Sequence, residues 1–150
     1  MSKPILLVED DRVYARLARS ALKQLHVSNK LVHVTDGKKA LEYLCDGANP
    51  KPCVILLDLY MPGMNGVEFL QVVKSDCTLR HIPVVVLTAS PQAEDVAMSF
   101  ELGAAEYVKK GFGYNDLLFK MSRLMSYWTG LEVSAASTTA PGRARQWQCL

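Results

Sequence analysis

Three acidic side chains follow directly after two short apolar segments. Residues 4–8 lead into Glu9 and Asp10, and residues 53–57 lead into Asp58. Each segment is long enough for one strand and apolar enough to be buried on both faces, as in a parallel sheet. If the two strands are neighbours, the carboxylates converge at the carboxyl edge of the sheet, where open α/β sheets bind ligands.

Carboxylates that lie so close together need a compensating charge. Two unit charges about 4 Å apart repel by roughly 4 kcal/mol at an effective dielectric constant of about 20. Mg²⁺ (or Mn²⁺) prefers hard oxygen ligands and suits such a group. The alternative is that Glu9, Asp10 and Asp11 only cap the following helix, as acidic residues often do. That alternative gives Asp58 no role.

The composition is ordinary for a soluble globular domain and gives no support for a nucleic-acid-binding or membrane protein. The 150 residues favour one domain, and the net charge of +2 comes without a long basic run. No apolar stretch is long enough to span a membrane, and no signal peptide is apparent. The cysteines form no Cys-x-x-Cys pair, which fits the reducing cytoplasm. They are Cys45, Cys53, Cys77 and Cys149.

Five strands alternate with five helices in the predicted pattern. The strands are expected at residues 4–8, 31–34, 53–57, 83–88 and 105–109, and the helices at 12–25, 36–44, 67–74, 90–103 and 115–128. Such alternation predicts an α/β domain over residues 1–128, with a doubly wound parallel sheet and helices on both faces. Residues 129–150 are rich in small and polar residues, and we expect them to be largely disordered or ordered only against a partner.

Capping residues give the expected helix boundaries. Asp36 can cap the second helix, and Asn65 with Glu68 forms a capping box for the third. Ser90-Pro91 predicts the start of the fourth helix, and Gly103 its end. The first helix is predicted from apolar residues at helical spacing: Val13, Leu17, Ala21 and Leu25.

A hydroxyl and an ammonium group join the carboxylates if the strands are parallel. Thr88 ends the fourth strand, and Lys110 follows the fifth. With a metal ion, these groups could hold a phosphoryl group while Asp58 attacks its phosphorus. Lys110 would neutralise the equatorial oxygens, and Thr88 would donate a hydrogen bond to one of them. Taken singly, Lys110 could be a solvated strand end and Thr88 an ordinary helix-approach residue.

Over residues 3–128 the sequence resembles the response-regulator receiver domains of two-component signalling. The resemblance implies a flavodoxin-like (βα)5 fold with strand order 2-1-3-4-5. It also implies a phosphoryl acceptor at Asp58 that is served by a sensor histidine kinase. The metal would be held by Asp10, Asp58 and the backbone carbonyl of Tyr60, with Glu9 acting through water. The resemblance rests on Glu9-Asp10 after Ile-Leu-Leu-Val, Asp58 before Leu-Tyr-Met-Pro-Gly-Met-Asn-Gly, Thr88 after Val-Val-Val-Leu, and Lys110 after Gly-Ala-Ala-Glu-Tyr-Val-Lys.

The sequence leaves one choice, between two adjacent lysines, and departs from the usual receiver pattern at two positions. The family places an aromatic residue three positions before its lysine, and Tyr107 satisfies this for Lys110 but not for Lys109. We therefore expect Lys109 to face outward. The family usually has proline after this lysine, whereas this chain has Gly111, so we expect a trans peptide bond and a looser loop. Tyr60 should place a large side chain at the mouth of the site.

A narrower resemblance is to the single-domain, phytochrome-associated regulators of cyanobacteria and other bacteria. These proteins also lack the proline, carry the sequence found here at residues 82–88, and end with an aromatic-tryptophan pair like Tyr127-Trp128. The resemblance implies that the partner kinase is a light-sensing histidine kinase.

The resemblance to receiver domains in general also implies a switch and an output surface. On phosphorylation the Thr88 hydroxyl would move and Tyr107 would turn inward, changing the face formed by helix 4, strand 5 and helix 5. Phe119 and Tyr127 lie off the apolar stripe of the last helix, and exposed aromatics there predict a symmetric homodimer. The alternatives are a half-buried Tyr107 and scattered surface aromatics. Residues 129–150 are too few for an output domain, so we expect output through protein contact.

Two other classes stay open at this point. Phosphatases of the haloacid dehalogenase type also use a strand-end aspartate and Mg²⁺, but they have an acid two positions later, where this chain has Tyr60. A pseudo-receiver would only bind partners and would never be phosphorylated at Asp58. Neither the acidic nor the lysine position is lost here, so we expect a phosphoacceptor domain rather than a turnover enzyme.

Overall fold

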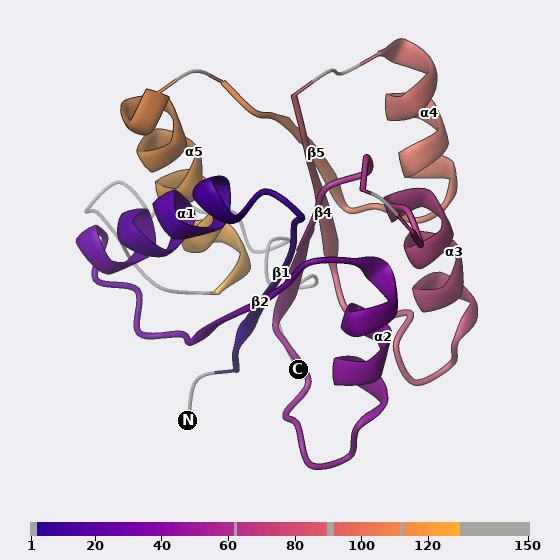
Figure 1. Cartoon of the computed structure of the whole chain (residues 1–150). Helices are drawn as coiled ribbons and strands as arrows, with labels where there is room; N and C mark the ends of the chain where they lie inside the picture. The colour runs from indigo at the N-terminus through magenta and orange to yellow at the C-terminus, as the bar shows by residue number, and fades with distance from the viewer. Residues whose placement is uncertain (1–2, 62, 90–91, 112, 130–150) are drawn as a thin grey trace.

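The computed structural model describes residues 3–61, 63–89, 92–111 and 113–129. Within these residues, strands and helices alternate along the chain (Figure 1). The strands are β1 (Ile5–Val8), β2 (Leu31–Val34), β3 (Val54–Leu57), β4 (Val84–Thr88) and β5 (Glu106–Lys109). The helices are α1 (Arg12–Gln24), α2 (Gly37–Cys45), α3 (Gly66–Ser75), α4 (Ala93–Glu101) and α5 (Gly113–Trp128). None of these helices is long and apolar enough to cross a membrane.

The strands form one parallel sheet in the order β2-β1-β3-β4-β5, which confirms the flavodoxin-like prediction. Helices α1 and α5 cover one face, and α2, α3 and α4 cover the other (Figure 1). Every residue of β1, β3 and β4 is buried, as expected for strands covered on both faces. The carboxyl ends of all five strands therefore lie along one edge of the molecule.

The helix boundaries follow the predicted caps in most places. The Asp36 carboxylate accepts from the Lys39 amide at 2.8 Å, and both bonds of the Asn65–Glu68 capping box are present. Helix α4 begins at Ala93 with Gln92 at the N-cap and no side-chain cap bond. The predicted start at Ser90-Pro91 lies outside the described residues. Gly103 has φ of +105° just beyond α4, the conformation that favours glycine after a helix.

The predicted apolar face of α1 is only partly correct, since Ala21 is buried and Leu25 packs against the core, but the other two residues are exposed. Val13 and Leu17 are 55% and 40% exposed, respectively. The helix instead buries a face made mostly of alanine, namely Ala15, Ala18, Ala21 and Leu22. This face packs against α5 and the sheet, and its small side chains let the helix approach closely. Val13 and Leu17 therefore lie on the exposed side of α1, although they stand at helical spacing to Ala21 and Leu25.

Helix α5 buries a continuous apolar stripe consisting of Leu117, Met121, Leu124, Met125 and Trp128. Polar contacts also tie it to β5. Lys120 Nζ donates to the Lys109 carbonyl at 2.5 Å, and Arg123 Nη1 and Trp128 Nε1 bond the Glu106 carboxylate at 3.0 and 3.2 Å. Strand β5 and helix α5 are thus joined at both ends of the strand.

Candidate functional site

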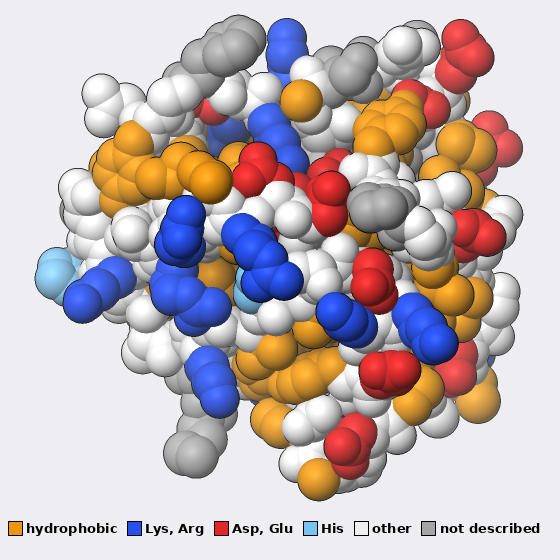
Figure 2. All heavy atoms as spheres, in the orientation of Figure 1, with side chains coloured by type: hydrophobic (Ala, Val, Ile, Leu, Met, Phe, Trp, Pro, Cys, Tyr) orange, Lys and Arg blue, Asp and Glu red, His pale blue; other side chains and the backbone are white. Residues whose placement is uncertain are grey.

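The carboxylates meet because β1 and β3 pair in register. Val8 lies opposite Leu57, and the Asp58 amide donates to the Val8 carbonyl at 3.0 Å, so Glu9 and Asp58 follow at the same level of the sheet. Glu9, Asp10 and Asp58 each offer a carboxylate oxygen, and these oxygens lie within 4.8 Å of one another. Figure 2 shows acidic side chains gathered on this part of the surface, above the strand ends in the view of Figure 1.

The donor set fits a divalent cation with hard oxygen ligands. Glu9 is 1% exposed and Asp58 8% exposed, whereas Asp10 faces solvent, so the group forms a shallow site open on one side. Three carboxylates at such separations repel one another strongly unless a cation lies among them. The Tyr60 amide donates to Asp58 Oδ1 at 3.1 Å, which holds the loop after β3 close to the Asp58 carboxylate.

Lys110 reaches into this acidic group from the end of β5. Its Nζ atom lies 2.5 Å from Glu9 Oε1 and 3.6 Å from Asp58 Oδ2, and its side chain is 13% exposed. Lys109 is exposed on the other side of the strand. The Lys110 amide donates to the Thr88 carbonyl at 2.7 Å, so β4 fixes where the lysine leaves the sheet. The geometry thus places Lys110, and not Lys109, beside the carboxylates.

Burial changes the acid–base properties of the group. It raises the pKa of Glu9 to about 7, mainly because the carboxylate is removed from water. Lys110 lowers this pKa through its hydrogen bond and its charge, and the negative charge of Asp58 raises it again. Lys110 therefore compensates only part of the cost of an ionised Glu9, which leaves a demand for further positive charge.

Thr88 and Tyr107 lie on neighbouring strands next to the site. Thr88 is fully buried at the end of β4, and Tyr107 of β5 pairs with Val86 in the register. The Tyr107 hydroxyl is buried and forms no well-directed hydrogen bond in the part of the chain that the structure describes. Burial raises the pKa of Tyr107, and the nearby Thr88 hydroxyl opposes that rise. Tyr107 as a whole is half-buried.

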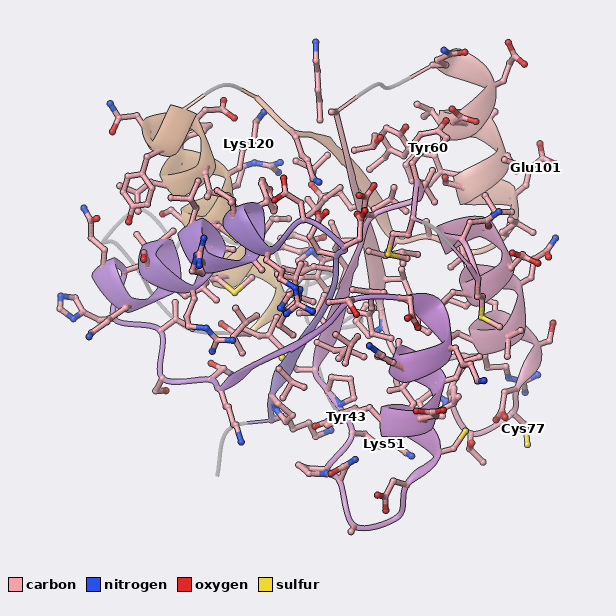
Figure 3. All side chains as sticks on the ribbon, viewed as in Figure 1. Tyr43, Lys51, Tyr60, Cys77, Glu101 and Lys120 are labelled. Carbon is pink, nitrogen blue, oxygen red and sulfur yellow. The ribbon has the colours of Figure 1, made fainter. Side chains whose placement is uncertain are left out.

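The mouth of the site is framed by Tyr60, which is 53% exposed. Its hydroxyl donates to Asp95 Oδ2, so the loop after β3 is linked to the first turn of α4 (Figure 3). That hydrogen bond, more than burial, raises the pKa of Tyr60 to about 12. Gly66 begins α3 directly behind this loop. A Cβ at this position would lie 2.5 Å from Leu59 Cα and 2.6 Å from the Asp58 carbonyl oxygen, so only glycine fits.

The glycine that follows Lys110 lies against a side chain of α5. A Cβ on Gly111 would lie 2.1 Å from Asp116 Oδ2, so the Asp116 carboxylate occupies the space that a larger residue would need. Asp116 is held there by an ion pair of 3.0 Å with Lys120. Figure 3 shows Lys120 on α5, beside the end of β5. The described residues contain no cis peptide bond, so the expectation of a trans bond before Gly111 is confirmed.

Several residues around the site were not identified from the sequence. Asp11 caps α1 by accepting from the Val13 and Tyr14 amides, so part of the helix-capping alternative is correct for this residue. His33 Nε2 donates to the Glu9 carbonyl at 2.7 Å. The Tyr14 ring lies under Lys110 Nζ, at 4.2 Å from its centroid. The pairing of β1 with β2 could have predicted that His33 lies near Glu9. The position of the Tyr14 ring could not be predicted, because it depends on how α1 is rotated about its axis.

The proposed interface residues lie on α5. Phe119 is 68% exposed, the most exposed large apolar side chain among the described residues. Tyr127 is half-buried and packs edge-to-face on Trp128, with ring centroids 4.9 Å apart. Residues 130–150, which include nearly all of the predicted tail, lie outside the described residues.

Comparison with known proteins identifies the class. Residues 5–122 match the response regulator receiver domain, and the chain therefore belongs to this family. It is 37% identical over 130 residues to Response regulator Rcp1 of Synechocystis sp., a match that covers 84% of this chain and 88% of Rcp1.

Solved structures agree with this assignment. The phosphorylated cyanobacterial phytochrome response regulator RcpA matches with a TM-score of 0.79 and 37% identity, over 85% of this chain and 94% of RcpA. The Mn²⁺-bound form of Rcp1 also matches with a TM-score of 0.79, at 36% identity over 89% of this chain and 99% of Rcp1. The chain is thus a receiver-domain response regulator homologous to phytochrome response regulators.

Proposed function

We propose that this protein is a single-domain response regulator that accepts a phosphoryl group on Asp58 from a sensor histidine kinase. The observation that carries the proposal is the convergence of Lys110 Nζ on Glu9 and Asp58, at 2.5 and 3.6 Å, beside the exposed Asp10 carboxylate. A carboxylate nucleophile, a fixed cation and a set of metal-ligating oxygens are the parts that phosphoryl transfer to aspartate requires.

In the proposed reaction an Asp58 carboxylate oxygen attacks the phosphorus of the donor phosphohistidine. The new O–P bond forms while the P–N bond breaks, and the electron pair of that bond leaves with the histidine ring. Lys110 lies close enough to Asp58 to stabilise the phosphoryl oxygens, and Thr88 would donate a hydrogen bond to one of them. A divalent cation, Mg²⁺ or Mn²⁺, held by Glu9, Asp10, Asp58 and the Tyr60 carbonyl would neutralise charge on the phosphoryl group.

The proposed kinase is light-sensing. One of the matching structures is of a cyanobacterial phytochrome response regulator, RcpA, and another is of Rcp1, which comes from Synechocystis sp.. The similarity extends over at least 85% of this chain in both cases. A regulator that serves such a kinase would act in the cytoplasm, without contacting nucleic acid or membrane.

The proposed output is a change in a protein interface. Phosphorylation adds about two negative charges and three acceptor oxygens beside Thr88, and Tyr107 would turn inward in response. The surface formed by α4, β5 and α5 would then change shape. The exposed ring of Phe119 and the partly exposed ring of Tyr127 lie on this surface and support a homodimer there.

Intact-mass spectrometry tests the assignment. Wild type, Asp58→Asn and Asp11→Asn would each be incubated with Mg²⁺ and acetyl phosphate. Asp11 is the matched control because it is adjacent to the cluster but caps α1, a role that asparagine can also fill. We expect a labile gain of one phosphoryl group in wild type and Asp11→Asn only.

Other outcomes of this experiment would contradict the proposal. A gain in Asp58→Asn would place the acceptor elsewhere. No gain in any of the proteins, with acetyl phosphate or with a phosphorylated histidine kinase, would favour a pseudo-receiver. Continuous hydrolysis of a generic phosphate ester would instead favour a phosphatase.

A further inference from the structure

Lys110 has a neighbour that the receiver pattern does not explain. Its Nζ atom lies 4.2 Å from the centroid of the Tyr14 ring, while Glu9 Oε1 lies 2.5 Å from the same atom. The face of an aromatic ring carries partial negative charge and attracts a cation that lies over it. The ammonium group is therefore held between a carboxylate and a ring face.

The local structure fixes the position of the ring. Asp11 accepts from the Tyr14 amide at 3.2 Å and from the Val13 amide at 2.9 Å, which anchors the first turn of α1 at the carboxyl edge of the sheet. The Tyr14 side chain is half-buried and packs against the core between the sheet, α1 and α5. Burial and the negative charges of Glu9, Asp116 and Asp58 raise the pKa of its hydroxyl, which keeps the ring neutral.

Open space lies on the same side of Lys110. A cavity of about 160 Å³ extends between α1, β5 and α5. Its lining includes Tyr14 and Lys110, together with Gly111 and Asp116. Gly111 adds no side chain of its own to this region, and the nearby Asp116 carboxylate is paired with Lys120 at 3.0 Å. The Tyr14 ring is therefore the group that supports the lysine on the side facing the cavity.

We propose that Tyr14 is a positioning residue for Lys110: its ring face holds the ammonium group toward the carboxylates and keeps it out of the cavity. The role of this contact in phosphoryl transfer rests on the proposed function, whereas the contact itself does not. The plain alternative is that Tyr14 only fills space in the core. In that case any side chain of similar bulk would serve equally well.

A nuclear magnetic resonance experiment tests the contact independently of phosphorylation. The ε-methylene resonance of Lys110, assigned by its loss in Lys110→Arg, should be shifted upfield by the ring in wild type. We expect Tyr14→Phe to keep this shift and Tyr14→Leu to lose it. Tyr114→Leu is the matched control, because Tyr114 is also half-buried against the same core but bonds Gln24 instead of Lys110. An unshifted Lys110 resonance in wild type would overturn the proposal.

The rate of phosphorylation by acetyl phosphate with Mg²⁺ tests the functional role. A cation–π contact of this kind predicts a roughly 2- to 30-fold lower rate in Tyr14→Leu, and a change of less than about twofold in Tyr14→Phe and Tyr114→Leu. In a Lys110→Met background, Tyr14→Leu should cause no further loss, because its effect acts through the lysine. Equal losses in both backgrounds would show a purely structural role and refute the proposal.

Two further points keep the test decisive. If thermal unfolding shows that Tyr14→Leu does not fold, Tyr14→Met provides a second residue of similar bulk without a ring. If wild type accepts no phosphoryl group at all, the proposed function fails, while the resonance of Lys110 still decides whether Tyr14 holds it.

Discussion

Glu9 should make the protein less stable as the pH rises when no divalent metal is present. Its carboxylate is 1% exposed, and burial raises its pKa from an ordinary value of 4.5 to about 7 despite the ion pair with Lys110. Below pH 4.5 the group is protonated in both the folded and the unfolded chain, so it has no effect. Between pH 4.5 and 7 the unfolded chain ionises first, and this favours unfolding.

The size of the effect follows from the pKa shift. One pKa unit corresponds to about 1.4 kcal/mol, so the rise from 4.5 to about 7 corresponds to a loss of roughly 3.5 kcal/mol in the free energy of unfolding. The loss should be complete above pH 7 or so, and it should persist at higher pH. It would be a large fraction of the stability of a typical domain, which is about 5–15 kcal/mol.

Urea unfolding with a chelator present, followed from pH 5 to pH 8, measures this dependence. Glu9→Gln is the matched variant because its side chain has a similar shape but does not titrate. We expect the free energy of unfolding to fall with pH in wild type and, between pH 5 and pH 8, to fall by about 2.5 kcal/mol less in Glu9→Gln. Adding Mg²⁺ at pH 8 should restore stability in wild type, because an ion that binds only the folded state stabilises it.

The outcome that refutes this reasoning is a parallel pH dependence in the two proteins. It would show that Glu9 titrates near its ordinary value, and that the Lys110 ion pair compensates its burial fully. A wild-type protein that becomes more stable between pH 5 and pH 8, relative to Glu9→Gln, would reverse the sign and contradict the argument directly.

Three further substitutions test the packing around the site and the proposed dimer. Gly111→Ala should destabilise the protein by less than about 1 kcal/mol in urea unfolding, because its Cβ meets only the Asp116 carboxylate, the end of a side chain that can move aside, and a loss above about 3 kcal/mol would contradict this. Gly66→Ala should cost more, about 1–3 kcal/mol, since its Cβ meets backbone atoms that cannot move aside; a stability equal to wild type would contradict the geometry. Phe119→Asp should halve the mass measured by light scattering, whereas Val72→Asp on α3, outside the proposed face, should not; an unchanged mass in Phe119→Asp would exclude this dimer.

The sequence predicted the sheet and the strand ends well. Buried parallel strands appear as continuous apolar runs, and the polar residue that ends each run marks the functional edge. For that reason Glu9, Asp58 and Lys110 could be assigned to one edge before the structure was known. The register of β1 with β3 then places the two acids side by side. Lys110 lies beside them and Lys109 faces outward, because successive residues alternate across a strand.

Other features depend on tertiary packing and left no clear pattern in the sequence. The buried face of α1 is lined by alanine, so the larger residues Val13 and Leu17 indicated the wrong side. The same rotation of α1 places Tyr14 under Lys110. Gly111 looked like a simple departure from the family, but its neighbour in space is Asp116, from the first turn of α5. A prediction based on local spacing does not include such contacts.

The strand order also determines how two copies of this domain can meet. Strands β2 and β5 are the open edges of the sheet, and each is only four residues long. Strand β5 begins at Glu106 and ends at Lys109, so charged residues lie at both ends of its exposed edge. Short, charged edges disfavour pairing with another strand. A neighbouring chain is thus poorly able to extend the sheet, and association on this side is left to helix side chains, whose contacts can be made and released without remodelling the backbone.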